Sequence, residues 1–244
     1  MGITAENVAA RFGLTREMQD EFAINSQRKA IEAQDAGKFK DEIHPLTVKA
    51  GRKEIVFDQD EYINRSTTLE KLGTLRPAFK PDGTVTAGNA SGINDGASFV
   101  ILASEAAVEK YGLKPMAEVV GIGQGGVEPD VMGLGPVPAV RNALINAGMK
   151  LSEIELLELN EAFAAQSLGV VRLLSEEHGE SEEAILSRCN VNGGAIALGH
   201  PVGASGNRII VTLAHELRRS GKTYGLASLC IGGGMGTAVV LKRI

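Results

Sequence analysis

The stretch NVNGGAIALGHPVGASG, residues 190–206, decides how the C-terminal part of this chain is interpreted, together with CIGGGMG at 230–236. His200 stands just before a predicted helix over 203–220, and Cys230 ends a predicted strand. A histidine in a glycine-walled turn at a helix N-terminus is open to a substrate on several sides. A thiol that faces glycines lies where backbone N–H groups can approach a ligand. The two stretches therefore predict a reactive turn beside a strand end.

The same two residues also allow a structural interpretation. In isolation, His200 is compatible with a turn histidine that only bonds the backbone, and Cys230 with a small buried hydrophobe. Under the functional interpretation, a nearby His200 lowers the pKa of Cys230 and the thiol stays accessible. Cys189 has no catalytic neighbour in the sequence, so we expect it to be buried.

Outward from these stretches, strands and helices alternate from about residue 96, which predicts an α/β sheet covered by helices. The apolar run ASFVILAS (97–104) is predicted to be a buried strand. The other expected strands are 117–123, 154–159, 224–230 and 235–242, and the expected helices are 104–112, 138–147, 162–177 and 203–220. The last two strands are expected to form a closing hairpin across IGGG, and the acidic segment 175–185 a solvated surface turn.

The first third of the chain has a different pattern. Thr4 and Thr15 are candidate N-caps of helices that end at Gly13 and Gly37. Two short strands are expected over 42–48 and 53–57, followed by a long loop over 58–96. Long ordered loops usually serve function. We therefore divide the chain into an α plus loop region over 1–95 and an α/β region over 96–244.

Composition excludes some function classes. The 244 residues carry 25 Lys and Arg against 30 Asp and Glu, and a net charge of −5 provides no basic surface for nucleic acid. No apolar stretch approaches the roughly 18 residues of a membrane span. The two cysteines do not make a disulfide scaffold, and the first residues lack a signal-like apolar core. We expect a cytoplasmic protein with no membrane or nucleic-acid partner.

Two glycine-containing patterns and a pair of glutamates resemble known functional motifs. Gly121, Gly123 and Gly126 match G-x-G-x-x-G, but the residues that follow cannot open a helix, so we reject dinucleotide binding. We also reject a P-loop at 221–223 and expect no metal site. Two glutamates bracket Asn160, at 158 and 161. They are typical either of acid–base chemistry or of a strand end with one exposed charge.

A family resemblance rests on four motifs. LNEAFAAQ (159–166) and GNASGINDGA (88–97), taken with the two stretches quoted first, resemble the thiolases, and within them most closely the acetoacetyl-CoA thiolases, or acetyl-CoA C-acetyltransferases. The resemblance implies the C-terminal half of the thiolase fold, a mixed sheet covered by helices, over 96–244. It implies that residues 1–95 are the remainder of a CoA-binding loop domain.

The resemblance also implies roles for single residues. His200 is similar to the histidine that activates the nucleophilic cysteine of thiolases. Cys230 resembles the second cysteine, which moves the α-proton, and Asn160 the residue that holds a water in an oxyanion hole. The implied reaction is Claisen condensation of two acetyl-CoA molecules and its thiolytic reverse, with CoA thioesters as substrates and no cofactor. The implied acyl-pocket positions are Ala162 and Phe163, and the implied pantetheine-arm positions are Phe79, Ala90, Ser91 and Gly92.

Two departures from the family pattern affect these expectations. Thiolases carry the acyl group on a cysteine in a VCGSG-like context, and no such sequence occurs in these 244 residues. We therefore expect no turnover by the isolated chain; the alternative is a CoA-binding or structural fragment. Asn64 stands where many relatives have Arg, so phosphate contacts are expected to fall to Arg65 or to be lost.

A chain that is half of a larger fold should also expose an apolar face. We expect a homo-oligomer, or pairing with a separate N-terminal thiolase half. The predicted contact is the apolar stripe of the 203–220 helix, and the alternative is that this stripe packs on the chain's own sheet. The stripe consists of Ile209, Ile210, Leu213, Ala214 and Leu217.

Overall fold

The computed structural model describes residues 1–244 and is organised around a four-stranded sheet with the order β3-β6-β5-β4. β3 is Ala117–Gly126, β4 is Leu156–Leu159, β5 is Tyr224–Ile231 and β6 is Met235–Arg243. β4 and β5 run parallel, and the other two pairs are antiparallel. The expected mixed sheet and its closing β5–β6 hairpin are confirmed.

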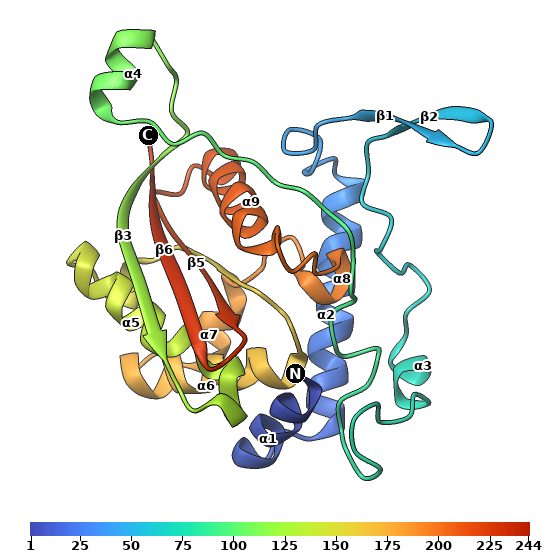
Figure 1. Cartoon of the computed structure of the whole chain (residues 1–244). Coiled ribbons are helices and arrows are strands. Elements are labelled where there is room, and N and C mark those ends of the chain that lie inside the picture. Colours follow the sequence, from blue (N-terminus) through green and yellow to red (C-terminus); the bar gives the residue numbers. More distant parts are fainter.

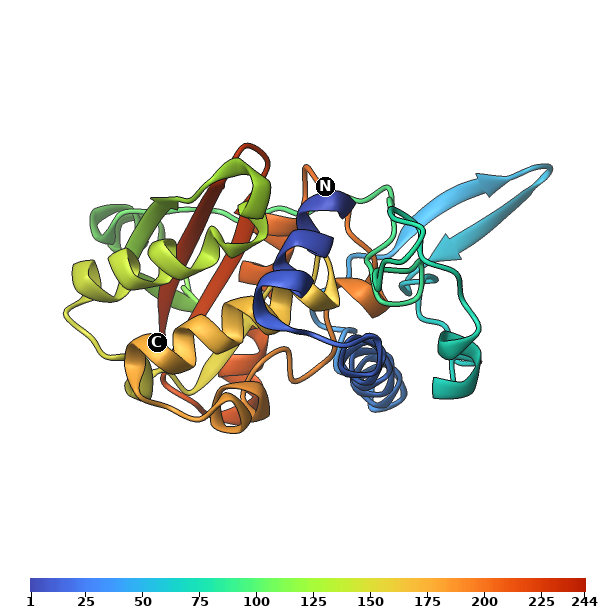
Figure 2. The ribbon, with the colours of Figure 1, turned by 90° about the horizontal axis from the view of Figure 1, so that it is seen from below.

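Helices cover both faces of this sheet (Figures 1 and 2). One face carries α5 (Pro136–Ala147) and α6 (Ala164–His178), and α7 (Glu182–Ser187) lies beside α6. The other face carries α9 (Ser205–Ser220). Successive residues of β4 point to opposite faces, because side chains alternate along a strand: Leu157 enters the larger core and Leu156 packs with α9.

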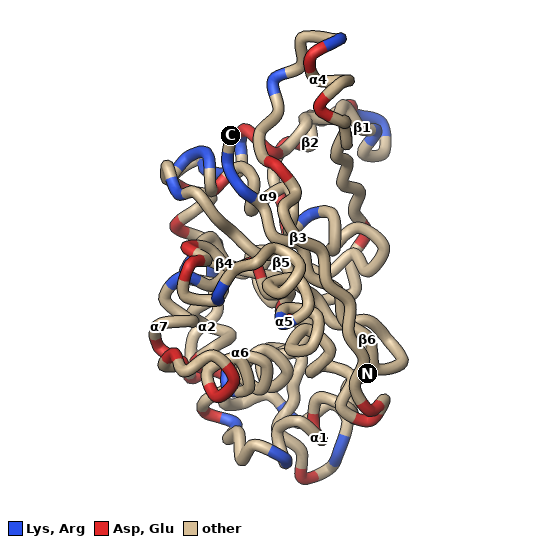
Figure 3. The backbone as a smooth tube through the Cα atoms, turned by 90° about the vertical axis from the view of Figure 1, so that its left-hand side faces the viewer, with Lys and Arg blue, Asp and Glu red and all other residues tan.

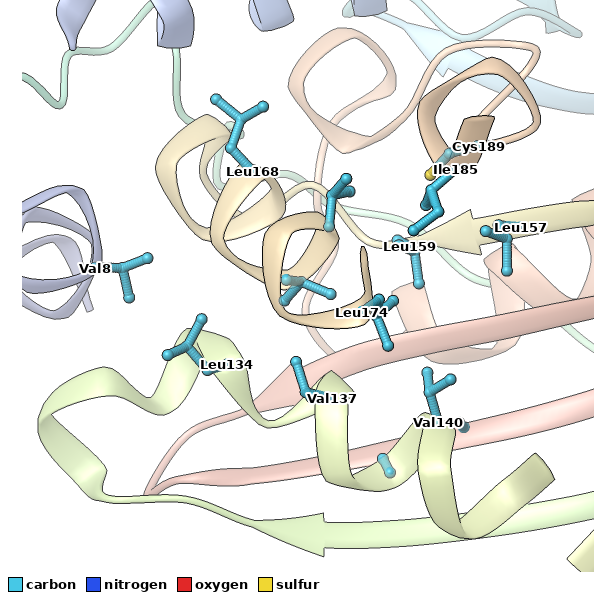
Figure 4. Packing of buried hydrophobic residues seen from close by; sticks show 14 of the residues in the cluster. Val8, Leu134, Val137, Val140, Leu157, Leu159, Leu168, Leu174, Ile185 and Cys189 are labelled. Carbon is cyan, nitrogen blue, oxygen red and sulfur yellow. The ribbon is translucent and has the colours of Figure 1, made fainter. Parts of the chain in front are cut away.

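The larger core joins the α/β region to the N-terminal helices (Figure 4). Val8 of α1 (Gly2–Phe12) packs in the same cluster as Leu134, Val137 and Leu168. Leu134 ends a short 3-10 helix, Pro129–Leu134, and a second one covers Leu151–Glu153. The two regions that the sequence separated near residue 95 therefore share one hydrophobic core.

α9 buries its apolar stripe within the chain. Ile209, Leu213 and Leu217 are each at most 1% exposed and pack with Leu156 and other sheet residues. The prediction that this stripe forms a contact between chains is wrong, and the alternative, packing on the chain's own sheet, is correct. The other two stripe residues, Ile210 and Ala214, are partly buried against the same cluster.

The N-terminal helices are close to the expected positions. α1 ends at Gly13 in the left-handed conformation, and α2 (Arg16–Asp35) begins after Thr15, whose hydroxyl accepts a hydrogen bond from the Met18 N–H. Thr4 lies inside α1 rather than at its cap. The hairpin strands β1 (Leu46–Ala50) and β2 (Lys53–Phe57) project from the body, and α3 (Leu69–Gly73) interrupts the long loop.

The segment 97–104 is not a strand. It runs unpaired across α9 into α4 (Glu105–Tyr111), and Phe99, Ile101 and Leu102 are 87%, 92% and 81% exposed. The prediction of a buried strand here is wrong. An apolar run forms a buried strand only where a neighbouring strand satisfies its backbone and another layer covers its side chains, and this chain supplies neither.

Two other sequence patterns have structural explanations. A Cβ at Gly121 or Gly123 would lie 2.6 or 2.2 Å from backbone atoms of α5, so these glycines allow strand and helix to approach closely. The acidic segment over 175–185 is the end of α6 and the start of α7, not only a turn, and it buries Ile185.

Basic and acidic residues are interspersed along the backbone (Figure 3). No helix has both the length and the apolar character that crossing a membrane requires. No three His, Cys, Asp or Glu side chains are arranged to hold a metal ion.

Candidate active site

The candidate site lies where the parallel strands β4 and β5 end. Leu159 of β4 pairs with Ser228 of β5, and the Asn160 N–H donates to the Ser228 carbonyl at 3.0 Å. Cys230 follows two residues later on β5. Ligands of α/β proteins commonly bind beyond the carboxyl ends of parallel strands. Asn160 and Cys230 therefore come from neighbouring strands at the edge where a ligand is expected.

His200 reaches Asn160 from the glycine-rich loop. The Nδ2 atom of Asn160 lies 3.4 Å from Nε2 of His200, at the long end of the hydrogen-bond range. The loop turns at Gly199, whose φ of +92° suits only glycine and whose missing Cβ leaves room for Asn94. Asn94 accepts a hydrogen bond from the His200 N–H at 3.0 Å. The backbone on which the imidazole sits is thus held by a residue of the 88–97 motif.

Ser205 determines which nitrogen of His200 carries the proton. Its hydroxyl lies 2.6 Å from Nδ1 of His200 and 3.0 Å from the Pro201 carbonyl; when it donates to the carbonyl, it accepts from Nδ1–H. With the proton on Nδ1, the neutral imidazole presents the lone pair of Nε2 on the side of Asn160. This is the tautomer that a general base requires.

The electrostatic surroundings favour the neutral imidazole. Burial lowers the pKa of half-buried His200, and the positive charge of Arg208 lowers it further. Asn160 is 2% exposed, and its Oδ1 atom is buried without a hydrogen-bond partner in the chain. A buried amide oxygen of this kind is an acceptor available to a water molecule or a ligand.

The two cysteines behave differently from each other, and one differs from expectation. Burial raises the pKa of Cys189 to about 12, and this residue is 4% exposed, as predicted. Cys230 is half-buried, but burial also raises the pKa of its thiol to about 11. Cys230 and His200 share no hydrogen bond, so the predicted lowering of the Cys230 pKa by His200 is wrong. Desolvation of the thiol is the main cause, and only a backbone hydrogen bond opposes it.

The residues assigned to the acyl and pantetheine positions come together. Ala90 forms an isolated bridge with Phe163, and both the N–H and the hydroxyl of Ser91 donate to the Ala162 carbonyl at 3.1 and 3.0 Å. The rings of Phe79 and Phe163 meet edge to face at 6.2 Å. These contacts join the 88–97 loop to the residues directly after Asn160.

A cavity of about 310 Å³ opens beside this loop. Its lining includes Tyr62, Asn64, Lys71 and Gly88. Arg65 does not take part, because its guanidinium makes a two-point ion pair with Asp35 on α2. The sequence predicted that CoA phosphate contacts either fall to Arg65 or are lost. Arg65 could bind a phosphate only if its ion pair with Asp35 broke.

Neither glutamate that brackets Asn160 is exposed. Glu161 is 2% exposed and accepts hydrogen bonds from Ser26, Asn190 and the Ile196 N–H, and so ties the 190–199 loop to the Asn160 turn. Glu158 is also 2% exposed, and burial raises its pKa to about 8. The interpretation as a strand end with one exposed charge is wrong.

Sequence reasoning did not assign three residues that orient the site. Asn94 and Ser205 lie inside the quoted motifs and hold the backbone and ring of His200, while Glu161 holds the loop. A signal was present for Ser205, because a serine five residues after a histidine at a helix start can reach the ring. No comparable signal connects Asn94 to a histidine 106 residues away.

Two family models match the chain. The model of the thiolase N-terminal domain matches residues 1–106, and that of the thiolase C-terminal domain matches residues 113–243. Acetyl-CoA acetyltransferases of Escherichia coli and Chromobacterium violaceum are 55% and 54% identical over 244 residues. The whole chain is covered in both alignments, and it spans 60% of the length of these relatives.

Solved structures give the same result. The crystal structure of the Bacillus anthracis acetyl-CoA acetyltransferase matches with a TM-score of 0.93 and 47% identity, covering 100% of this chain and 60% of that one. Human mitochondrial 3-ketoacyl-CoA thiolase in complex with CoA matches with a TM-score of 0.89 and 45% identity, covering 100% and 59%. The family models, the sequence identity and the shared fold agree: the chain belongs to the thiolase family and is similar to its acetyl-CoA acetyltransferases.

Proposed function

We propose that this chain supplies the His200, Cys230 and Asn160 part of a thiolase active site that acts on acetyl-CoA and acetoacetyl-CoA. The observation that carries the proposal is the fixed imidazole: Ser205 holds Nδ1 at 2.6 Å and Asn160 lies 3.4 Å from Nε2. A neutral imidazole whose Nε2 carries a lone pair can take the proton of an attacking thiol. The resulting N–H can donate to the oxygen of a thioester.

The protonation states at rest favour the thiolytic direction. A thiol with a pKa of about 11 keeps its proton at neutral pH, so Cys230 starts as an acid. In thiolysis, His200 would activate the nucleophile, and Cys230 would protonate the carbanion that leaves as acetyl-CoA. In condensation, Cys230 must first lose that proton.

An acyl-carrying cysteine must come from outside these 244 residues. Cys189 is buried and has a pKa of about 12, and Cys230 is assigned to the α-proton. We propose that the exposed segment 97–102 takes part in pairing with the polypeptide that supplies this cysteine, or with a second copy of the chain. Its unpaired backbone and exposed Phe99 and Ile101 support this role.

The acyl chain and the pantetheine arm would bind along the surface where the 88–92 loop meets Ala162 and Phe163. The cavity beside Tyr62 and Lys71 is a candidate for more distant parts of CoA. A second candidate function, CoA binding without turnover, is favoured by the raised pKa of both thiols.

The test is thiolysis of acetoacetyl-CoA by the purified chain. The proposal expects binding of CoA, no turnover, and no acetyl group on either cysteine by mass spectrometry. Robust turnover that is abolished by Cys230→Ser and accompanied by acetyl-Cys230 would contradict it, because Cys230 would then be the acyl carrier. Failure to bind CoA at millimolar concentration would contradict both candidate functions.

A further inference from the structure

A partly buried arginine connects the two elements that hold the imidazole. Arg208 lies on the first turn of α9, three residues after Ser205. Its Nη1 atom is 3.6 Å from Oε2 of Glu158, which lies on β4 two residues before Asn160. The side chains of Arg208 and Glu158 are 22% and 3% exposed. This contact joins the start of α9 to the end of β4.

The charges around this pair come from several elements. Glu42 from the α2–β1 connection, Glu161 after β4 and Glu216 on α9 all act on Glu158. Arg208 in turn acts on Glu42, on Asp60 and on His200. Arg208 is thus a cation shared by several carboxyl groups. It is also the charged group that lowers the pKa of His200. Its Nη1 has no hydrogen-bond partner, and because burial raises the pKa of Glu158 to about 8, the guanidinium faces a carboxyl group that keeps its proton at neutral pH.

We propose that Arg208 is a positioning residue for His200: with Glu158 it holds α9 against β4, so that Ser205 and Asn160 engage opposite nitrogens of the ring. The catalytic use of this positioning rests on the proposed role of His200 as a base, whereas the positioning itself does not. A neutral ring with its proton on Nδ1 is ready to accept a proton at Nε2.

The competing explanation is that Arg208 only neutralises buried carboxyl groups. The same helix offers a matched control. Arg219 pairs with Glu216 at 2.6 Å, and it lowers the pKa of His215, after burial, as Arg208 does for His200. If Arg208 acts on His200 specifically, the two arginines should affect different histidines.

The experiment is an NMR titration of the histidine-labelled chain, which reads the pKa and tautomer of each ring without any need for turnover. Arg208→Gln should raise the pKa of His200 and mix its tautomers, and it should leave His215 unchanged. Arg219→Gln should raise the pKa of His215 and leave His200 unchanged. Arg208→Lys keeps the charge and should keep the low pKa of His200.

Several results would overturn the proposal. They are an unchanged His200 in Arg208→Gln, equal changes at both histidines, or a raised His200 pKa in Arg208→Lys. If Arg208→Gln does not fold, Arg208→Lys is compared with Arg219→Lys: a raised His200 pKa in the first variant, or an equal change of His200 in both, would overturn the proposal. Because the titration measures no acyl transfer, its result is independent of whether the chain acts as part of a thiolase.

Discussion

Replacement of Glu158 by glutamine should remove a large part of the pH dependence of folding. The folded chain keeps the proton of Glu158 up to a pKa of about 8, because burial disfavours the carboxylate, whereas the unfolded chain releases it near 4.5. Between these values the folded state binds one more proton than the unfolded state. The free energy of unfolding therefore falls as the pH rises through this window.

The size of the effect follows from the same two pKa values. At about 1.4 kcal/mol for each pH unit, the full window from 4.5 to about 8 corresponds to about 5 kcal/mol. Between pH 6 and pH 8 the share of Glu158 is about 2 kcal/mol, since the group is only half ionised at the upper end. Glu42, with a pKa raised by burial to about 7, adds a decline of the same sign that remains in the variant.

The free energy of unfolding at each pH is measured by urea unfolding. The probe is far-UV circular dichroism, because the chain contains no tryptophan for fluorescence. Glu158→Gln, which mimics the protonated side chain, should lose about 2 kcal/mol less than the wild type between pH 6 and pH 8. Glu177→Gln is the matched control: the hydrogen bond from Arg141 lowers the pKa of Glu177, so its contribution is constant across this range. Parallel profiles for the wild type and Glu158→Gln would refute the reasoning.

Two further predictions concern the cysteines and the exposed segment. Limited iodoacetamide treatment with peptide mapping should modify Cys230 before Cys189, because only Cys189 is fully buried. The reaction of Cys230 should be slow at pH 7 and faster as the pH approaches 11, because both thiols are protonated at neutral pH. Earlier modification of Cys189 would reject the assignment. If segment 97–102 pairs with a second copy, light scattering should find the wild-type chain self-associated at micromolar concentration and a Phe99→Asp, Ile101→Asp variant less so, with stability within about 0.5 kcal/mol of the wild type, since both side chains are exposed. A wild-type monomer would contradict pairing with a second copy and leave the separate polypeptide as the partner.

Local signals in the sequence predicted much of the fold. Thr15, Ser104, Gly112 and Gly148 mark helix ends in the structure as their capping preferences indicate. The β5–β6 hairpin follows from two apolar runs separated by glycines, which supply the positive φ angles of Gly233 and Gly234. These features depend on a few neighbouring residues, so one sequence is enough to find them.

Features that depend on distant partners were not predictable in this way. The run at 97–104 has the composition of a buried strand, but its environment depends on what lies beside it, and nothing in this chain covers Phe99 or Ile101. The pKa of Cys230 depends on how deeply its strand end is packed, which glycine spacing does not indicate. The link between Asn94 and His200 joins two distant motifs and became evident only in three dimensions.

The most direct test of the proposed function is complementation. The Escherichia coli relative is 55% identical to this chain over the 244 residues that align. A polypeptide made from the rest of that relative should be mixed with this chain, and thiolysis of acetoacetyl-CoA should be measured. Turnover should appear only in the mixture, vanish with His200→Gln or Cys230→Ser, and survive Arg219→Gln. A mixture that forms a stable complex and binds CoA, yet gives no turnover that depends on His200 and Cys230, would contradict the account.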